Sequence, residues 1–207
     1  MNKKLLFILP TLNMGGAEKV TINIVNSLDT SMFDIALIVI DSRYKNLESS
    51  VSKDIKLKYL NITKTRNAFY TIFKQIKMIK PDIVYSSLNR TNILILMVKL
   101  FYPFFKVVIR EPSIPSVQIK QNYMSSSMLF LIRFLYHWAT KIIAQTKYMK
   151  KEIEDIYKVD EKKVIAINNP LDKESIENSL QDKINPFANY QENFNFVYVG
   201  RLSDEKN

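Results

Sequence analysis

The feature that most constrains this chain is its alternation of short apolar runs with segments of helical periodicity. Leu5 to Leu9 is a continuous apolar run closed by a proline, a pattern typical of a fully buried strand. The next segment carries an apolar stripe at helical spacing, which predicts a helix packed through that stripe: Ala17, Val20, Ile24 and Leu28. The chain therefore begins as a strand followed by an amphipathic helix.

The same alternation continues over most of the chain. Further strands are predicted at 34–40, 56–60, 82–85, 106–109, 141–144 and 164–167, and further helices at 69–79, 93–101, 124–138 and 147–157. Repeated strand–helix units favour a parallel sheet with helices on both faces, a Rossmann-like α/β fold. Because such sheets bind ligands at the carboxyl ends of their strands, functional residues are expected in the loops that follow the strands.

The composition changes near Asn168. Residues 171–192 are polar and contain Pro186, which indicates a linker with at most one short helix. Phe194 to Val199 predicts one more strand, and Gly200 follows it as at the start of a new α/β unit. We therefore predict a domain at 1–170, a linker at 171–192, and the truncated start of a second domain at 193–207.

Composition excludes several kinds of site. The 207 residues include no cysteine and one histidine, so disulfides, thiolate metal sites and multi-histidine clusters are excluded. No acidic cluster suggests a carboxylate metal site, and no metal is predicted. His137 lies in an apolar helical segment, where a core or interfacial position is favoured over catalysis.

The net charge of +10 favours an anionic partner, although a solvated basic surface explains it equally well. No nucleic-acid-binding module is recognisable, so nucleic acid is not predicted as a partner. The apolar stretches at 93–109 and 128–138 are interrupted or short, and a spanning helix needs roughly 20 apolar residues. We expect a cytoplasmic protein, with contact to an anionic membrane surface at the inner face as a hypothesis.

Two glycines, Gly15 and Gly16, separate the first strand from the first helix. Glycines let the backbone approach a ligand closely, and the N–H groups at a helix start suit a phosphate. The alternative is an ordinary strand–helix turn. The loop is neither a dinucleotide-binding fingerprint nor a Walker loop, which disfavours both of those classes.

Three other polar segments are candidates for ligand binding. Arg201 and Lys206 follow the last predicted strand, where they could converge on a diphosphate, although two solvated loop charges are the simpler interpretation. Arg110 and Glu111 follow the strand at 106–109, and a local ion pair is the simpler interpretation there. The segment 86–92, with Asn89 and Arg90, offers groups that suit carbohydrate but are also common in loops.

Taken together, these segments resemble the retaining glycosyltransferases commonly called family 4, which have a GT-B fold. The matching elements, in order, are 15–19 (Gly-Gly-Ala-Glu-Lys), 142–146 (Ile-Ile-Ala-Gln-Thr), 164–170 and 199–207 (Val-Gly-Arg-Leu-Ser-Asp-Glu-Lys-Asn). The resemblance covers essentially the whole chain. The version with 110–113 (Arg-Glu-Pro-Ser) is similar to members that extend lipid-linked or cell-surface polysaccharides.

The resemblance implies two Rossmann-like domains facing each other, with this chain as the N-terminal, acceptor-binding half. It implies that Gly15, Gly16, Arg201 and Lys206 bind the phosphates of a nucleotide-sugar donor. Acceptor binding, to a glycan or lipid-linked glycan, falls to Asn89, Arg90, Arg110 and Glu111. It further implies sugar transfer with retained anomeric configuration and without a metal or resident cofactor.

Two departures from the family pattern stand out. Many members place a histidine where this chain has Arg110 and Glu111, and the family's C-terminal domain with its paired glutamates lies beyond this sequence. We therefore expect a truncated glycosyltransferase, inactive as this chain alone. The alternative is a non-catalytic acceptor-binding subunit that requires a separate donor-binding partner.

Overall fold

The computed structural model describes residues 2–171, 173, 176–177, 194 and 196. Its contacts divide the chain into a first unit, Met1–Pro170, and a second unit, Leu171–Asn207. Most of the linker predicted at 171–192 and of the strand predicted at 194–199 lies outside the described residues, so both stay predictions. The account below concerns the first unit.

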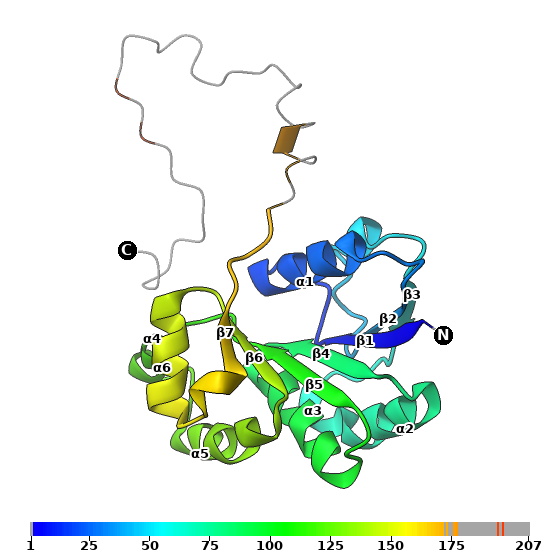
Figure 1. The fold of residues 1–207 in the computed structure, drawn as a ribbon. Coiled ribbons are helices and arrows are strands. Elements are labelled where there is room, and N and C mark those ends of the chain that lie inside the picture. The colour runs from blue at the N-terminus through cyan, green and yellow to red at the C-terminus, as the bar shows by residue number, and fades with distance from the viewer. Residues whose placement is uncertain (1, 172, 174–175, 178–193, 195, 197–207) are drawn as a thin grey trace. The chain divides into compact units, whose positions relative to one another are not determined.

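The first unit is built on one parallel sheet (Figure 1). Its described strands, in the spatial order β3-β2-β1-β4-β5-β6-β7, are β1 (Lys3–Leu9), β2 (Phe33–Val39), β3 (Lys56–Tyr59), β4 (Ile83–Ser87), β5 (Lys106–Arg110), β6 (Lys141–Ala144) and β7 (Val164–Ala166). Every neighbouring pair is parallel. The predicted Rossmann-like α/β fold, a parallel sheet with helices on both faces, is confirmed.

Six α-helices lie within the described residues: α1 (Gly16–Ser27), α2 (Phe69–Ile79), α3 (Asn89–Phe101), α4 (Pro115–Lys120), α5 (Ser126–Leu135) and α6 (Lys147–Tyr157). Short 3-10 helices are η1 (Glu48–Ser50), η2 (Thr65–Ala68), η3 (Tyr136–Trp138) and η4 (Glu161–Lys163). The helices predicted at 69–79 and 147–157 are confirmed residue for residue. Thr146 caps α6 as expected, because its Oγ1 accepts from Met149 N at 3.1 Å.

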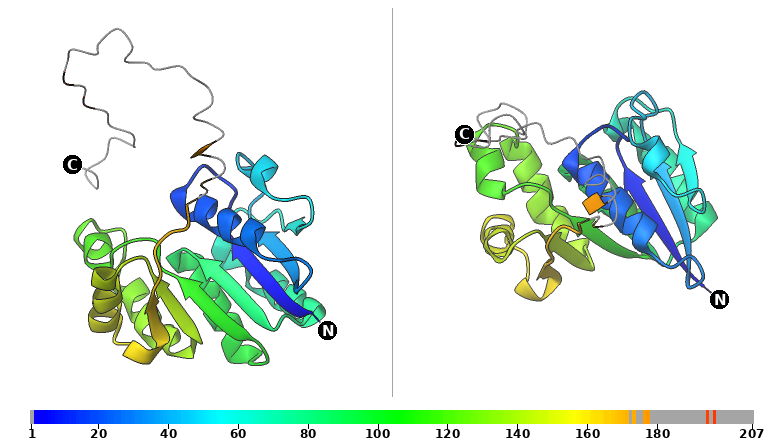
Figure 2. Two further views of the ribbon diagram at one scale, coloured as in Figure 1. Left: turned by 45° about the horizontal axis from the view of Figure 1, so that its top comes forward. Right: turned by 90° about the horizontal axis from the view of Figure 1, so that it is seen from above.

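The two faces of the sheet are covered unequally. Since strand side chains alternate, Leu6 and Ile8 of β1 face a core formed with α2, α3, α5 and α6, whereas Phe7 and Leu9 face α1. Figure 1 shows α1 on one side of the sheet and α2, α3 and α5 on the other. The right-hand view of Figure 2 looks down on α1 with the strands beneath it.

The apolar stripe predicted for the first helix is not its most buried face. The fully buried positions of α1 are Glu18, Thr21, Ile22 and Val25. Val20, Ile24 and Leu28 are only half-buried and line an open apolar groove of about 390 Å³ beside the sheet. Helical spacing identified an apolar face correctly, but that face borders the part of the sheet that no described helix covers.

Two other boundaries differ from the prediction. The helix predicted at 93–101 begins at Asn89, so that part of the polar segment 86–92 is the first turn of α3 rather than a loop. The helix predicted at 124–138 divides into α5 and η3. Helix α4 was not predicted; it begins at Pro115, a residue favoured in the first turn of a helix.

Candidate functional site

The strand order reverses between β1 and β4, which makes the carboxyl ends of these two strands the natural position for a ligand. The glycine loop follows β1, Asn89 and Arg90 follow β4, and Arg110 and Glu111 end or follow β5. All six predicted site residues that the structure describes therefore lie along one edge of the sheet. Arg201 and Lys206 lie outside the described residues.

The start of α1 presents backbone donors at this edge. Gly15 is the N-cap, and the first bond closed within the helix runs from Lys19 N to Gly15 O at 3.0 Å. The amides of the three residues between them, 16–18, have no acceptor within the helix, as in the first turn of any α-helix. These N–H groups and the positive end of the helix dipole suit an anion or a sugar oxygen.

The two glycines of this loop have different surroundings. A Cβ at Gly15 would lie 2.2 Å from Glu18 Oε2, whereas a Cβ at Gly16 would have no atom within 4 Å. Gly15 has φ −93° and ψ 146°, which any residue adopts, so its lack of a side chain matters for space rather than for backbone conformation. Gly16 leaves the helix start open to a ligand, and Gly15 makes room for the glutamate.

The Glu18 carboxylate lies at the same helix end. Thr11 Oγ1 donates to Glu18 Oε1 at 3.2 Å, and Glu18 is 8% exposed. A carboxylate in the first turn interacts favourably with the helix dipole and can accept hydrogen bonds from hydroxyl groups. The loop after β1 therefore offers both donors and acceptors, a combination that suits a sugar phosphate better than a bare anion.

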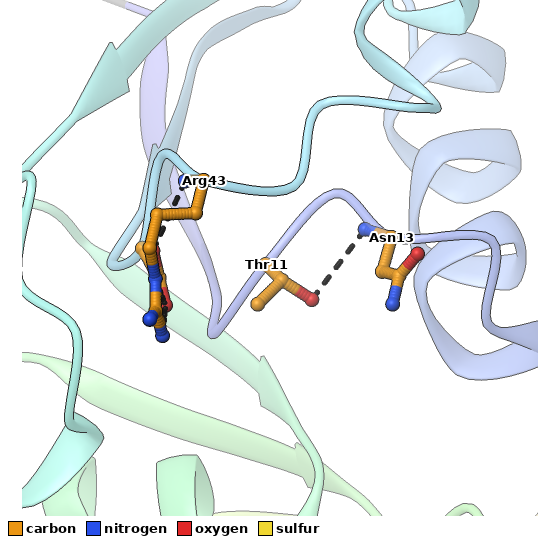
Figure 3. Close-up of polar contacts among 4 residues, drawn as sticks. Thr11, Asn13 and Arg43 are labelled. Atoms are coloured by element: carbon orange, nitrogen blue, oxygen red, sulfur yellow. Dashed lines mark hydrogen bonds and ion pairs between the residues drawn. The ribbon is translucent and has the colours of Figure 1, made fainter.

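The loop after β2 adds a cation that the sequence analysis missed. Arg43 donates to Asp41 through Nε and Nη2, at 3.0 and 2.7 Å, and Figure 3 shows Arg43 beside the loop that carries Thr11 and Asn13. The two loops are joined by backbone bonds, one of them from Leu12 N to Tyr44 O at 3.1 Å. The hydrogen bond from Arg43 lowers the pKa of Asp41 and raises that of Arg43.

Arg43 is thus an oriented charge rather than a free one. Its side chain is 57% exposed, whereas that of Asp41 is 8% exposed. A guanidinium held through one edge keeps other N–H groups for phosphate or sugar oxygens. The available signal in the sequence was a charged pair two residues apart directly after the strand predicted at 34–40.

The residues after β4 and β5 form a buried polar cluster around Glu111, which has no exposed surface. Its Oε1 accepts from Tyr136 Oη and, at 3.1 Å, from Asn92 Nδ2. Asn92 also donates to Arg110 O at 3.1 Å and accepts from Ser86 Oγ at 2.8 Å. The cluster joins β4, β5, α3 and η3 at the carboxyl edge of the sheet.

Burial raises the pKa of Glu111 to about 7, although the hydrogen bonds from Tyr136 and Asn92 lower it. Burial, together with the nearby Glu111 charge, raises the pKa of Tyr136 well above its ordinary value. Glu111 Oε2 has no hydrogen-bond partner among the described residues. Near neutral pH the carboxyl group is therefore partly protonated, which reduces the cost of burying it.

Arg110 is also buried, at 3% exposed. Its side-chain contacts lie on the α1 side of β5, away from the cluster around Glu111. Its Nη2 donates to Asn169 Oδ1 at 2.5 Å, and Asn169 Nδ2 donates to Gln145 Oε1 at 3.2 Å. Gln145 Nε2 in turn donates to Pro112 O at 2.6 Å. This chain of hydrogen bonds connects the ends of β5, β6 and β7, and desolvation lowers the pKa of Arg110.

Asn89 and Arg90 have different exposures although they are neighbours. Asn89 is buried and donates from Nδ2 to Gln118 Oε1 at 2.6 Å, which ties α3 to α4. Arg90 is exposed and lines a pocket of about 740 Å³ with Lys64, Arg66 and apolar side chains of α3 and α5. Leu88, between β4 and α3, has φ 78°, a strained backbone conformation for a leucine that is common near functional sites.

The predicted acceptor residues thus share an edge but not a pocket. Arg90 belongs to the pocket on the α3 side, and Arg110 lines the apolar groove on the α1 side. Glu111 and Asn89 face inward and hold other residues in place. Of this set, Arg90 is exposed, whereas Asn89, Arg110 and Glu111 are buried. No group of three metal-ligating side chains occurs within the described part of the chain.

Comparisons with known proteins agree with this architecture. A family model described as Glycosyltransferase Family 4 matches residues 14–175. The chain is 27% identical, over 99% of its length and 57% of the relative's, to an N-acetylgalactosamine-N,N'-diacetylbacillosaminyl-diphospho-undecaprenol 4-alpha-N-acetylgalactosaminyltransferase of Campylobacter jejuni subsp. jejuni. It is 26% identical, over 66% of its length and 36% of the relative's, to an uncharacterized glycosyltransferase of Methanocaldococcus jannaschii.

Among solved structures, HepE of Anabaena in complex with UDP and glucose superposes with a TM-score of 0.66 at 14% identity. The match covers 88% of this chain and 50% of HepE. The chain therefore spans about half the length of HepE and at most 57% of the curated relatives named here. No helix within the described residues has the length and apolar character needed to cross a membrane.

Proposed function

Because this chain belongs to Glycosyltransferase Family 4, we propose that it supplies the acceptor-binding half of an enzyme that transfers a sugar from a nucleotide-sugar to a lipid-linked or cell-surface glycan. The observation that carries the proposal is the family match over residues 14–175, which covers the chain from the glycine loop through β7 and so every strand but β1. In this proposal the other half, which binds the donor, corresponds to the further length of the relatives.

A lipid-linked acceptor is favoured by the Campylobacter relative, whose name describes transfer to a sugar attached to diphospho-undecaprenol. That match extends over 99% of this chain. The chain's net charge of +10 is compatible with an acceptor that carries a diphosphate and lies at an anionic membrane surface. We propose peripheral contact with the inner face of the membrane on the same grounds.

Donor phosphates are proposed to meet the start of α1, at Gly15 and Gly16, together with Arg201 and Lys206. The first-turn amides at 16–18 support the first part of this assignment, since they are donors at the positive end of a helix. The leaving nucleoside diphosphate gains negative charge in the transition state, and cations and helix amides stabilise it there without a metal. We accordingly propose no resident cofactor and no metal requirement.

The residues proposed to bind the acceptor are chosen by the exposure of their side chains to solvent. Arg43 and Arg90 are exposed at the carboxyl edge, so they are the described cations proposed to contact acceptor phosphate or hydroxyl oxygens. Arg110, Glu111 and Asn89 are proposed to act as positioning residues, which fix the ends of β4, β5 and β7 through buried hydrogen bonds. Retention of anomeric configuration is proposed from the family resemblance.

The test uses the protein as encoded by its complete gene. It is incubated with radiolabelled UDP-sugars and a monosaccharide-diphospho-prenol, with and without EDTA, and the lipid product is separated and analysed by NMR. We expect label in the lipid fraction, an α product from an α-linked donor, and a rate unchanged by EDTA. Donor consumption without labelled lipid or glycan would contradict the transferase proposal, and binding of acceptor without any transfer would favour a non-catalytic acceptor-binding subunit.

A further inference from the structure

A pocket of about 740 Å³ opens on the face of the sheet opposite α1, between η2, α3 and α5. This volume falls within the range of about 300–1,000 Å³ that small-molecule pockets occupy. Its polar residues follow the carboxyl ends of two strands: Thr63 to Arg66 come after β3, and Arg90 comes after β4. The pocket therefore lies at the same edge of the sheet as the glycine loop.

The pocket is cationic at its polar part. Lys64, Arg66 and Arg90 line it with Thr63 and Thr65, and none of the lining residues is acidic. All three cations are exposed, and the ion pairs found among the described residues involve other side chains. Two guanidinium groups, an ammonium group and two hydroxyl groups make a donor set suited to a phosphate or diphosphate.

The remaining walls are apolar and continue outside the pocket. They consist of Phe69, Ile93, Leu94, Met97, Met128 and Leu131. On α3, Phe101 lies four residues beyond Met97 and is 69% exposed. On α5, Phe134 lies three residues beyond Leu131 and is 58% exposed. Residues three or four apart share a helix face, so an apolar surface extends from the pocket along both helices. A monomeric protein rarely exposes such a surface without use.

We propose that this pocket binds the diphosphate and the first isoprenoid units of a prenyl diphosphate lipid, with the chain leaving over α3 and α5. A free diphosphate would not use the apolar walls, and a neutral lipid would not use the three cations. An amphiphile with a diphosphate at one end and a linear chain of isoprene units at the other uses both. The inference rests on the proposed function, whose acceptor it specifies, and assigns the lipid part of that acceptor to named residues.

The test is isothermal titration of the 207-residue chain with geranylgeranyl diphosphate below its aggregation concentration. Inorganic diphosphate and geranylgeraniol are titrated separately as the two halves of the ligand. We expect the whole amphiphile to bind at least roughly tenfold more tightly than either half. Equal affinity for inorganic diphosphate would overturn the proposal in favour of a free-anion site, and equal affinity for geranylgeraniol would overturn it in favour of an apolar groove.

Three variants locate the site. Arg66→Gln combined with Arg90→Gln is expected to weaken binding of geranylgeranyl diphosphate roughly tenfold or more. Met97→Gln is expected to weaken binding of the amphiphile but to leave inorganic diphosphate unaffected. Lys151→Gln, on the exposed surface of α6, removes a charge elsewhere and is expected to change affinity less than roughly twofold. A loss in the Lys151 variant as large as that in the combined arginine variant would show non-specific electrostatic attraction and contradict the proposal.

The inference and the proposed function can fail separately. Sugar transfer by the complete protein with unchanged lipid binding in the arginine variants would contradict the pocket and leave the transferase standing. Loss of lipid binding in those variants, with no transfer to any glycan by the complete protein, would support the pocket and contradict the transferase.

Discussion

The carboxyl edge of the sheet has two parts with opposite character. At β1 and β2 the functional groups are open: first-turn amides of α1, a glycine with free space around it, and an exposed arginine held by Asp41. After β4 and β5, Arg90 is exposed, but the cluster around Glu111 is closed: Glu111 and Asn92 are fully buried and bonded to each other. The open groups are accessible to a ligand, whereas the closed cluster joins the ends of the strands.

This difference teaches that similar residue types after neighbouring strands can serve different purposes. The pair of Arg43 and Asp41 contributes modestly to stability, because the Arg43 side chain is 57% exposed and solvent screens the pair in part, although Asp41 is only 8% exposed. A buried carboxyl group such as that of Glu111 contributes strongly through the partners it satisfies or leaves unsatisfied. The predictions below separate the two parts by measuring stability and activity for each.

The largest effect on stability is expected from Asn92→Ala. The substitution removes the hydrogen bonds to Arg110 O and Glu111 Oε1, leaves Ser86 Oγ without its acceptor, and leaves Glu111 with Tyr136 as its remaining partner. We expect the free energy of unfolding to fall by about 3 to 4 kcal/mol, measured by urea denaturation. Asn46→Ala, at an exposed loop position, is the matched control and should change it by less than about 0.5 kcal/mol. A small loss for Asn92→Ala would mean that the closed part is not a structural cluster.

The second prediction concerns how Glu111 makes the free energy of unfolding depend on pH. Its folded pKa of about 7 lies above its ordinary value of 4.5, so between these pH values the folded state binds a proton that the unfolded state has lost. The stabilisation is fully present below pH 4.5 and is lost as the pH rises through 7, by on the order of 3 kcal/mol. Glu111→Gln should remove this contribution, so the variant and the wild type should differ in slope between pH 5 and 8. Parallel curves over that range would contradict the assignment.

The third effect concerns activity in the open part. Arg43→Gln should lower kcat/KM of the complete protein roughly tenfold or more, about 1.4 kcal/mol, because an oriented guanidinium contacts ligand oxygens. Its effect on unfolding should be about 1 kcal/mol, smaller than that of Asn92→Ala, because the 8% exposed carboxylate of Asp41 loses its charged partner. Lys53→Gln, an exposed position on the loop before β3, is the control and should retain activity. Equal activity of both variants would remove Arg43 from the site.

The smallest effect separates the two glycines. Gly15→Ala should destabilise the fold by about 1 kcal/mol, because the new Cβ displaces the Glu18 carboxylate from its contact with Thr11. Gly16→Ala should be neutral or stabilising by about 0.5 kcal/mol, since it meets no atom and restricts the unfolded chain. The thermal midpoints of the two variants are measured side by side, and equal midpoints would mean that the space at Gly15 is not needed.

Most of the fold followed from local patterns. The strand at 141–144 and the helices at 69–79 and 147–157 have the predicted limits because proline, a capping threonine and clear periodicity mark them. The buried face of α1 could not be predicted from local patterns, because it depends on where the sheet lies and not on which stripe of the helix is most apolar. Glu18 and Thr21 are buried there by their position over the sheet.

The position of the candidate site could be predicted from the sequence, but the contacts of its side chains could not. Alternation placed the polar segments at one edge of a parallel sheet, where the structure has them. It could not tell that Glu111 points inward to Tyr136, a partner 25 residues away, or that Arg90 and Arg110 line different hollows. Arg43 was missed because its role depends on the loop contact between Leu12 and Tyr44, which no local pattern shows.

The central claim, that this edge binds the acceptor, is tested most directly by photo-cross-linking. A monosaccharide-diphospho-prenol with a diazirine on its first isoprene unit is irradiated with the 207-residue chain, and labelled peptides are identified by mass spectrometry. The account predicts label at 63–69, 90–97 and 128–131, which line the pocket assigned to the first isoprene units, and its loss when unlabelled acceptor competes. Competable label confined to the opposite ends of the strands, around Lys3, Phe33 and Lys106, would contradict it.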